Sequence, residues 1–467
     1  MRATTLAALV FGAMAAVLAV LQAPSDSDLF WHLRTGAWIL DHGRLLDHDI
    51  WSFTKNGAAY NVGSWLGDVT MALALRAASW LGIDALRAAL VGVAAFFVAR
   101  ITLRAQPHVG WAAAPIIGTI LVSHMVWGDR PQLFTLAIFP IVLDVVLATR
   151  ADGRTRRLFV LPPLFLAWAN LHNAFVLGLV AVAVVAIDAL LESDVRTRRA
   201  FAAVTVLCVL ATQLNPAGSG AITRAAAYGA LLPSWIVEDR PLDVLSGPGL
   251  IFAALLLAAL AAALVRGREG IAARLGTSLL WPGLIVPFAL LALAIQRETP
   301  YACMILAPFA AAMVPDALRR VPAEAPVVPR AMALVACLVI AAALIAEVAV
   351  DAPRAPDLGA YPTGALGPLA AARGNLLNEY DWGGFLIEYA PDHPTFIDGR
   401  GEALFVPDVL GDFLRVVALG PGYRDVLTRW DISLVLLRPD RPLAGALRED
   451  GWRVLGRSNA WVLLSRP

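Results

Sequence analysis

The stretch NAFVLGLVAVAVVAIDALL occupies residues 173–191, and Asp188 is its only ionisable residue. A helix needs about 20 mostly apolar residues to cross the hydrocarbon core of a bilayer. Lipid offers the backbone no hydrogen-bond partners, and a helix satisfies its own. The stretch therefore predicts a membrane-spanning helix.

The whole chain has the composition of a membrane protein. Of its 467 residues, 59% are hydrophobic and 16% are charged, whereas soluble proteins carry about 25% charged residues. The net charge of +1 gives no indication of a nucleic-acid partner. The spacing of the cysteines fits neither a metal site nor a disulfide framework, and all lie in apolar runs: Cys208, Cys303 and Cys337.

Eleven spans are predicted, so the expected fold class is an α-helical polytopic membrane protein. They are residues 4–22, 84–104, 110–126, 131–149, 156–170, 173–191, 200–214, 249–265, 277–295, 299–315 and 331–350. The first is expected to be an uncleaved helix, and a signal peptide cut near Ala23 is the alternative.

The arginines predict the orientation, because loops on the cytoplasmic side are rich in basic residues. With the N-terminus inside and alternating spans, the inner loops hold most of them: Arg100, Arg104, Arg150, Arg154, Arg156, Arg157, Arg196, Arg198, Arg199, Arg266, Arg268, Arg274, Arg319, Arg320 and Arg330. The short outer loops hold only Arg130, Arg224, Arg240 and Arg297. This orientation places the C-terminal region outside.

Residues 64–81 are apolar but contain Asp68 and Arg76. If they formed a span, the orientation of every later span in the membrane would be reversed. These two residues are about two helical turns apart and share one helix face. We therefore expect an amphipathic helix on the outer surface, within a first outer loop of residues 23–83.

Two domains are expected: a transmembrane domain over residues 1–350 and an outer domain over residues 351–467. The second has a soluble composition and alternates short apolar runs with helical patterns, which predicts a small α/β domain. The expected strands are 385–389, 395–397, 432–437, 453–455 and 460–464, with helices at 407–419 and 422–429.

Two carboxylates, Asp26 and Asp28, follow the first span. Such a pair can act as a general base or ligate a divalent metal; solvated loop acids or helix caps are the alternative. The spans carry no acid, base or histidine pair at mid-membrane, which argues against an ion-coupled transporter.

The order of motifs in the first hundred residues resembles the first outer loop of the GT-C superfamily, especially aminoarabinose transferases and protein O-mannosyltransferases. The motifs are Asp28, Gly43, the stretch 47–53, Trp65-Leu66, Gly82 and Arg87. The resemblance implies that Asp28 is catalytic, that Asp26 is its neighbour in a modified Asp-x-Asp motif, and that no cofactor is needed. A divalent metal at Asp26 and Asp28 remains the alternative.

The sequence departs from those relatives at two places. Leu29 stands where they have Glu, and Asn61-Val62-Gly63 stands where they have Lys-Pro-Pro. It is more similar to a group of uncharacterised bacterial membrane proteins with an Asp-x-Asp-x-x-Trp-His signature. The resemblance therefore implies a bacterial cytoplasmic membrane and leaves the sugar and the acceptor open.

Other polar residues fall in the predicted outer turns and the outer domain. Arginine forks bind phosphate well, so the candidates for the leaving phosphate are Arg130, Arg297 and His172. The alternative for each arginine is a role as an interfacial anchor or as the partner of a nearby acid. The alternative for His172 is a hydrogen-bonded histidine between helices. Candidates for acceptor binding or support are Asp129, Asn170, Glu238, Asp398 and Arg400. The motifs 378–384 and 396–400 contain glycines that are expected to mark tight turns.

These observations predict a membrane glycosyltransferase that uses a polyprenyl-phosphate-linked sugar and inverts the anomeric centre. Its expected partners are that donor, membrane lipids and an unidentified acceptor. A non-enzymatic flippase or transporter of lipid-linked glycans and a membrane assembly protein are the alternatives.

Overall fold

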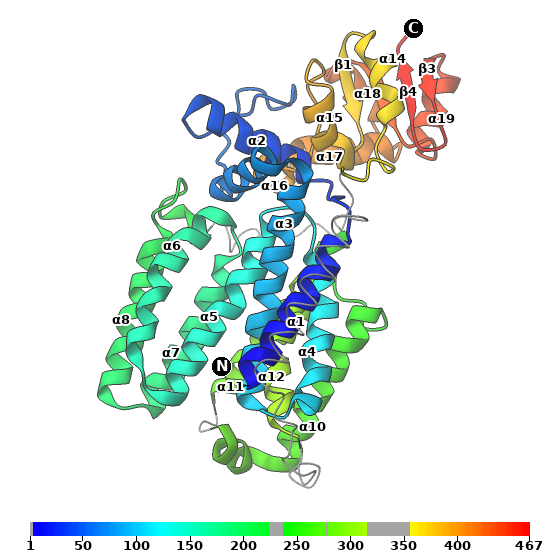
Figure 1. Cartoon of the computed structure of the whole chain (residues 1–467). Coiled ribbons are helices and arrows are strands. Elements are labelled where there is room, and N and C mark those ends of the chain that lie inside the picture. Colours follow the sequence, from blue (N-terminus) through cyan, green and yellow to red (C-terminus); the bar gives the residue numbers. More distant parts are fainter. Residues whose placement is uncertain (1–2, 224–236, 276–278, 315–354) are drawn as a thin grey trace. The chain divides into compact units, whose positions relative to one another are not determined.

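The computed structural model describes residues 3–223, 237–275, 279–314 and 355–467 (Figure 1). The chain divides into two compact units. The helical unit comprises Met1–Gln22 and Asp84–Pro353, and the mixed unit comprises Ala23–Ile83 and Arg354–Pro467. The first outer loop and the C-terminal region, which are far apart in sequence, therefore belong to one unit.

The helical unit consists of helices that match the predicted spans. They are α1 (Ala3–Val20), the second part of α3 (Trp65–Ala105), α4 (Val109–Ser123), α5 (Gln132–Asp152), α6 (Leu161–Leu171), α7 (Phe175–Glu192), α8 (Val195–Thr212), α10 (Gly247–Leu275), α11 (Leu280–Ala294) and α12 (Thr299–Ala312). The predicted span 331–350 lies outside the described residues. Among the described helices, six are long and apolar enough to cross a bilayer. The chain is a multi-pass membrane protein.

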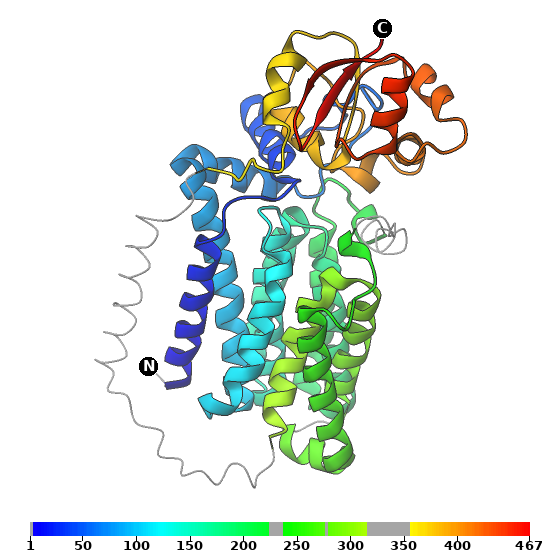
Figure 2. The ribbon, with the colours of Figure 1, turned by 90° about the vertical axis from the view of Figure 1, so that its right-hand side faces the viewer.

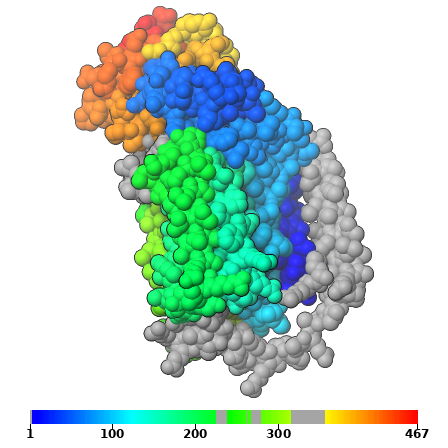
Figure 3. Space-filling model, turned by 90° about the vertical axis from the view of Figure 1, so that its left-hand side faces the viewer, coloured from blue at the N-terminus to red at the C-terminus, as the bar shows by residue number. Residues whose placement is uncertain are grey.

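Small residues allow α1 and α3 to cross closely. A Cβ added at Gly12 would lie 2.9 Å from the carbonyl oxygen of Gly92, and one added at Gly92 would lie 3.1 Å from Ala16 Cβ. Glycine and alanine at a helix crossing bring two backbones together, which is the usual way that helices pack in lipid. Outward apolar side chains complete the membrane character: Ile187 and Leu191 on α7, and Val206 and Leu210 on α8, are exposed. Figure 3 shows the side of the molecule that faces left in Figure 1, where α8 lies.

Arginines in the predicted inner loops form ion pairs with acids near the ends of neighbouring helices. Arg104, at the end of α3, donates to Asp144 of α5 at 2.8 Å. Arg150, near the end of α5, donates to Asp188 of α7 at 2.6 Å. The two acids in these spans are thus neutralised at the helix ends, and neither is an isolated charge in lipid.

The mixed unit contains a four-stranded sheet with the strand order β1-β2-β4-β3 (Figure 2). β1 and β2 are parallel, while β4 is antiparallel to both β2 and β3. The strands are β1 (Asn375–Asn378), β2 (Ile432–Leu437), β3 (Arg453–Arg457) and β4 (Val462–Ser465), and the helices include α2 (Leu29–His42), α14 (Leu366–Ala370), α15 (Gly383–Tyr389), α16 (Gly401–Leu404), α17 (Asp408–Val417), α18 (Tyr423–Arg429) and α19 (Pro442–Glu449).

Most predictions for this unit are confirmed, and three need correction, the third being the strand expected at 395–397. The strands expected at 432–437, 453–455 and 460–464 and both helices are present. Residues 385–389, predicted as a strand, are part of α15, a short helix that begins at the glycine pair 383–384; its successive residues Phe385, Leu386 and Ile387 are all buried, so no alternation distinguishes it from a strand. The strand β1 was not predicted, since only Leu376 and Leu377 give it apolar character.

α3 also differs from the prediction of a surface helix separated from the second span. It runs from Trp65 to Ala105 and is interrupted only by non-helical backbone at Ala78 and Ser79. Its first part belongs to the mixed unit and packs on α2. Asp68 and Arg76 do share one face, and this face lies against α2: Asp68 is bonded to His32, and Arg76 pairs with Asp41 at 2.6 Å.

The first loop and the C-terminal region share one hydrophobic core. Phe30 of α2 packs edge-on against Tyr361 and Phe385, with ring centroids 5.4 and 6.0 Å away. Ser52 forms a parallel bridge with Thr395, and Thr54 donates to the carbonyl of Phe396 at 2.7 Å. The prediction of a strand at 395–397 is therefore wrong: the segment forms only the isolated bridge at Thr395, because its backbone-to-backbone hydrogen bonds are with the first loop and not with a strand of the sheet.

Candidate functional site

Asp28 lies at the start of α2, half-buried, in a turn that its own motif builds. Its backbone N–H donates to Asp26 Oδ1 at 2.9 Å, and the indole N–H of Trp31 donates to Asp28 Oδ1 at 3.1 Å. Asp28 occupies the cap position of α2, but its side chain makes no capping hydrogen bond. The carboxylate is therefore held by Trp31 one turn along the helix and not by the helix end.

Three motifs that are distant in sequence meet at this carboxylate. A Cβ added at Gly399 would lie 1.9 Å from Asp28 Oδ1 and 2.8 Å from Trp31 Nε1. A Cβ added at Gly384 would lie 2.9 Å from the carbonyl oxygen of Ser27. The glycines of motifs 378–384 and 396–400 permit close packing against the Asp-x-Asp motif, rather than only marking turns.

Arg400 is fully buried and engaged by two carboxylates. It donates from Nε and Nη2 to Asp398 at 2.7 and 2.6 Å, and from Nη1 to Asp49 at 2.5 Å. Trp51 and Tyr60 lie against its guanidinium. Burial alone would lower the pKa of Arg400, but the two aspartates hold it above its usual value. This buried triad links the first loop to the C-terminal segment.

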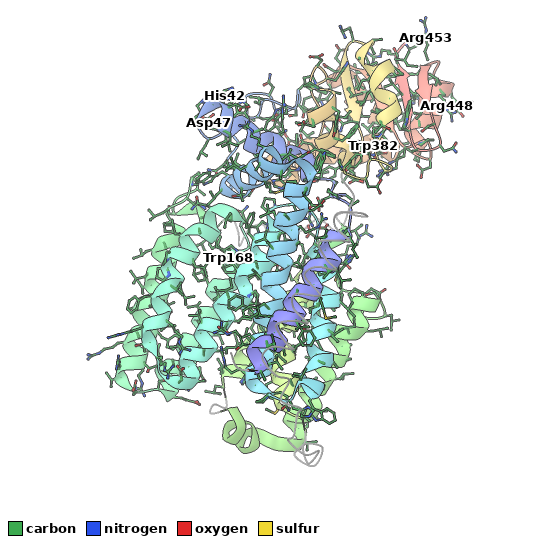
Figure 4. All side chains as sticks on the ribbon, viewed as in Figure 1. His42, Asp47, Trp168, Trp382, Arg448 and Arg453 are labelled. Carbon is green, nitrogen blue, oxygen red and sulfur yellow. The ribbon has the colours of Figure 1, made fainter. Side chains whose placement is uncertain are left out.

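Asn378 and Glu379 support the same region from the end of β1. The buried Asn378 side chain donates to the carbonyl of Ile397 and accepts from the N–H of Phe396, both at 2.8 Å. Glu379, also buried, accepts two hydrogen bonds from Arg441 at 2.7 Å each. Trp382, labelled in Figure 4, is buried in the hydrophobic core of this unit. Motif 378–384 therefore shapes the segment that carries Gly399.

A second pair of residues fixes the crossing of α2 and α3. His32 Nδ1 and Asp68 Oδ1 are hydrogen-bonded at 2.7 Å, and both side chains are buried. The His32 ring lies 3.5 Å from that of Trp31. A Cβ added at Gly36 would lie 2.0 Å from the carbonyl oxygen of Asp68. The Trp-His dipeptide of the motif thus connects Asp28 to the first part of α3.

The helical unit contains a polar cluster of its own. Arg130 donates to Glu238, and Arg297 pairs with Asp239 at 2.9 Å. The short helices η3 (Val237–Asp239) and η4 (Gln296–Glu298) carry the acids and Arg297, and a backbone hydrogen bond from Gln296 to Arg240 joins them. Arg130 and Arg297 also both act electrostatically on the hydroxyl of Tyr301. The sequence-predicted residues Arg130, Glu238 and Arg297 therefore belong to one cluster.

Glu298 is a titratable group of this cluster whose pKa is raised toward neutral pH. Burial raises the pKa of its carboxyl to about 7, while Arg297 opposes the shift and Asp239 adds to it. The charge of the cluster therefore changes near neutral pH.

The other predicted residues of the helical unit have local partners. His172 Nδ1 is hydrogen-bonded to Thr135 Oγ1 at 2.9 Å, and Trp168, labelled in Figure 4, donates to the same oxygen. Asn170 donates to the carbonyl of Leu214 at 3.0 Å and so joins the ends of α6 and α8.

Asp129 pairs with Arg87, which is buried and also donates to Asp84 at 2.7 Å and to the carbonyls of Ala19 and Gln22. These carbonyls lie at the end of α1, so Arg87 caps that helix.

Sequence reasoning missed several participants. Asp49 was noticed only as part of an extended stretch, yet it is the second carboxylate of the buried triad. Gly399 was noticed only as a turn glycine. Both depend on contacts over about 350 residues, which local patterns do not encode. Within the described ranges, no three His, Cys, Asp or Glu side chains are grouped as a metal site.

Comparison with known proteins gives matches only at the level of structure. No protein-family model matches the sequence, and no curated protein matches it. The structure is similar to that of ArnT from Cupriavidus metallidurans bound to undecaprenyl phosphate, with a TM-score of 0.51 and 12% identity over 99% of this chain and 98% of that one.

It is also similar to the archaeal oligosaccharyltransferase AglB from Archaeoglobus fulgidus, solved with an inhibitory peptide and a dolichol-phosphate. Here the TM-score is 0.52 at 12% identity, over 93% of this chain and 69% of that one. ArnT, an aminoarabinose transferase, and AglB are both GT-C members, and this chain has the fold of the GT-C superfamily.

Proposed function

We propose that the protein is a membrane glycosyltransferase that transfers a sugar from a polyprenyl-phosphate donor to an acceptor on the outer face of a bacterial cytoplasmic membrane. In this proposal the N-terminus lies inside and the mixed unit lies outside. The two similar proteins were solved with undecaprenyl phosphate and dolichol-phosphate, respectively, which supports a lipid phosphate as the leaving group.

The observation that carries the proposal is the placement of Asp28. Its carboxylate is half-buried, and the backbone of Gly399 and the indole of Trp31 limit where it can lie. A carboxylate that is fixed in this way can accept a proton in a defined direction, which is what a general base requires.

The proposed reaction is a single displacement. Asp28 takes the proton of the acceptor hydroxyl or amine, and the acceptor atom attacks the anomeric carbon. The bond between that carbon and the phosphate oxygen breaks, and the electron pair leaves with the lipid phosphate. Attack opposite the leaving group inverts the anomeric centre, and no nucleotide is consumed.

The arginines of the polar cluster are proposed to bind the phosphate. Arg130 and Arg297 carry two positive charges, and guanidinium groups bind phosphate oxygens in a fork geometry. Glu238, Asp239 and Glu298 counter these charges in the protein itself. An approaching phosphate would favour the neutral form of Glu298, which would then leave Arg297 to the ligand.

The test is a comparison of glycans between strains that differ in one carboxylate. A strain lacking the protein is complemented with wild type, Asp28→Asn or Asp41→Asn, and its glycolipids and envelope glycans are compared by mass spectrometry. Asp41 is a matched control, because it is an exposed acid near the other end of α2.

We expect a glycan that is lost without the protein, retained with Asp41→Asn, and reduced at least about 100-fold with Asp28→Asn, the usual effect of losing a general base. If Asp28→Asn restores the glycan fully, the transferase is excluded, and a flippase or assembly protein becomes the better explanation. A transfer assay with purified protein, run with and without EDTA, tests for a metal at Asp26 and Asp28.

A further inference from the structure

The side chains of the triad Asp49–Arg400–Asp398 are shielded from solvent. The triad nevertheless lies directly beside the proposed base Asp28. Gly399 sits between the two members Asp398 and Arg400 and touches Asp28. All three triad side chains are buried, and three charge-assisted hydrogen bonds join them. Such a cluster resists rearrangement, because moving any member would leave a buried charge unpaired.

The contact at Gly399 leaves the carboxylate little freedom on that side. A Cβ added at Gly399 would lie 1.9 Å from Asp28 Oδ1. The oxygen therefore occupies the space that the side chain of any other residue at 399 would fill. The Trp31 indole donates to the same oxygen at 3.1 Å, and its nitrogen also lies close to Gly399, 2.8 Å from the added Cβ. Asp28 Oδ1 is therefore in contact with the Gly399 backbone and held by a hydrogen-bond donor.

The triad fixes the position of the Gly399 backbone. Arg400 donates from its backbone N–H to Asp398 Oδ1 at 3.1 Å, and its guanidinium donates to both oxygens of the same carboxylate. The turn 398–400 is thereby closed on itself. Asp49 then ties that turn to the first loop, since it also accepts from the hydroxyl of Ser52.

We infer that Arg400 is a positioning residue for Asp28: together with Asp49 and Asp398 it fixes the Gly399 backbone, and that backbone aims the Asp28 carboxylate. The C-terminal segment then serves the reaction by holding the base rather than by binding the acceptor. The role in catalysis rests on the proposed function, whereas the positioning itself does not.

Carboxylate labelling tests the positioning without any substrate. The full-length protein is treated with a carbodiimide and glycine ethyl ester, and the reaction rates of individual side chains are read by mass spectrometry. The variants are Gly399→Ala and Arg400→Lys, with Gly411→Ala as the matched control, because a Cβ at Gly411 meets nothing within 4 Å. The buried Asp412 reports whether the mixed unit stays folded.

We expect labelling of Asp28 to rise several-fold in Gly399→Ala and in Arg400→Lys, while Asp412 and the Gly411→Ala variant stay at wild-type rates. Wild-type labelling of Asp28 in Gly399→Ala would overturn the inference. Wild-type labelling of Asp28 in Arg400→Lys would overturn it as well. If Arg400→Lys also exposes Asp412, the unit has opened, and Asp49→Asn, which keeps the Arg400–Asp398 pair, replaces it: labelling of Asp28 should rise there too, and a wild-type rate would overturn the role of the triad.

Transfer kinetics give the second readout. Displacing a reacting group by about 1 Å costs on the order of 100-fold in rate, so Gly399→Ala should lower kcat by that factor with little change in KM for the donor. A wild-type kcat in Gly399→Ala, beside an inactive Asp28→Asn, refutes the positioning role and leaves the proposed function intact. Full activity in Asp28→Asn refutes the proposed function, while the labelling result stands on its own.

Discussion

Replacing Arg400 with methionine should strongly destabilise the mixed unit, because it leaves two buried carboxylates without their cation. Methionine has a similar length and no charge, so the variant removes the guanidinium while filling much of its space. Asp49 and Asp398 would remain, both buried and without the cation that they share. The triad carries a net charge of −1, and the variant leaves −2 in the same volume.

The expected cost follows from this charge count. Removing one partner of a buried ion pair destabilises a protein by about 3–5 kcal/mol, because the remaining charge stays desolvated. Asp49→Asn should cost less, about 1–2 kcal/mol, since Asp398 and Arg400 then form a neutral pair and an amide oxygen can still accept from Arg400. The order of the two variants is therefore as informative as the magnitudes.

Hydrogen exchange of backbone amides measures this difference within one unit of a large chain. The amides of Val435 and Leu436 in β2 lie in the centre of the sheet. A loss of 3–5 kcal/mol corresponds to a protection factor lower by roughly two to three and a half powers of ten. Protection in Arg400→Met within tenfold of wild type, or an equal loss in Asp49→Asn, would refute the argument that the triad is bound by charge balance.

Two further predictions concern other buried polar groups. The folded pKa of Glu298, about 7, lies above its ordinary 4.5, so the stability that it contributes is complete below about pH 4.5 and is lost as the pH rises toward 7. Glu298→Gln should remove this loss of roughly 3 kcal/mol. The thermal unfolding midpoints at pH 5 and pH 8 should then differ less in the variant than in wild type. An unchanged difference would contradict the raised pKa of Glu298. Asn378→Leu should cost about 2–4 kcal/mol, because the N–H of Phe396 and the carbonyl of Ile397 lose their partner; chemical denaturation that finds less than 1 kcal/mol would show that these groups find another partner.

The membrane part of the fold could be read from the sequence because lipid imposes a simple rule on it. Every apolar segment near 20 residues must be helical, and the described helices appear where such segments were predicted. Short elements were harder: α15 was taken for a strand, since five residues such as 385–389 complete too few turns to show a helical period.

The site was predictable only as far as its local motifs. Asp28 and Trp31 stand in one turn, so their contact follows from the spacing of three residues. The contact of Asp28 with Gly399 joins positions 371 residues apart. No charge or period in the sequence pairs Asp49 with Arg400, because many other acids and arginines have the same local appearance.

The mixed unit is built from two pieces of chain, and this has a consequence for biosynthesis. Residues 84–353 separate the two pieces, and at about 5–20 residues per second a ribosome needs roughly 15–55 s to make them. During that interval Phe30 and the rest of the first piece lack the aromatic and strand partners that the second piece supplies. A nascent chain stalled or truncated before residue 354 would thus present an incomplete core, a natural target for chaperones and proteases.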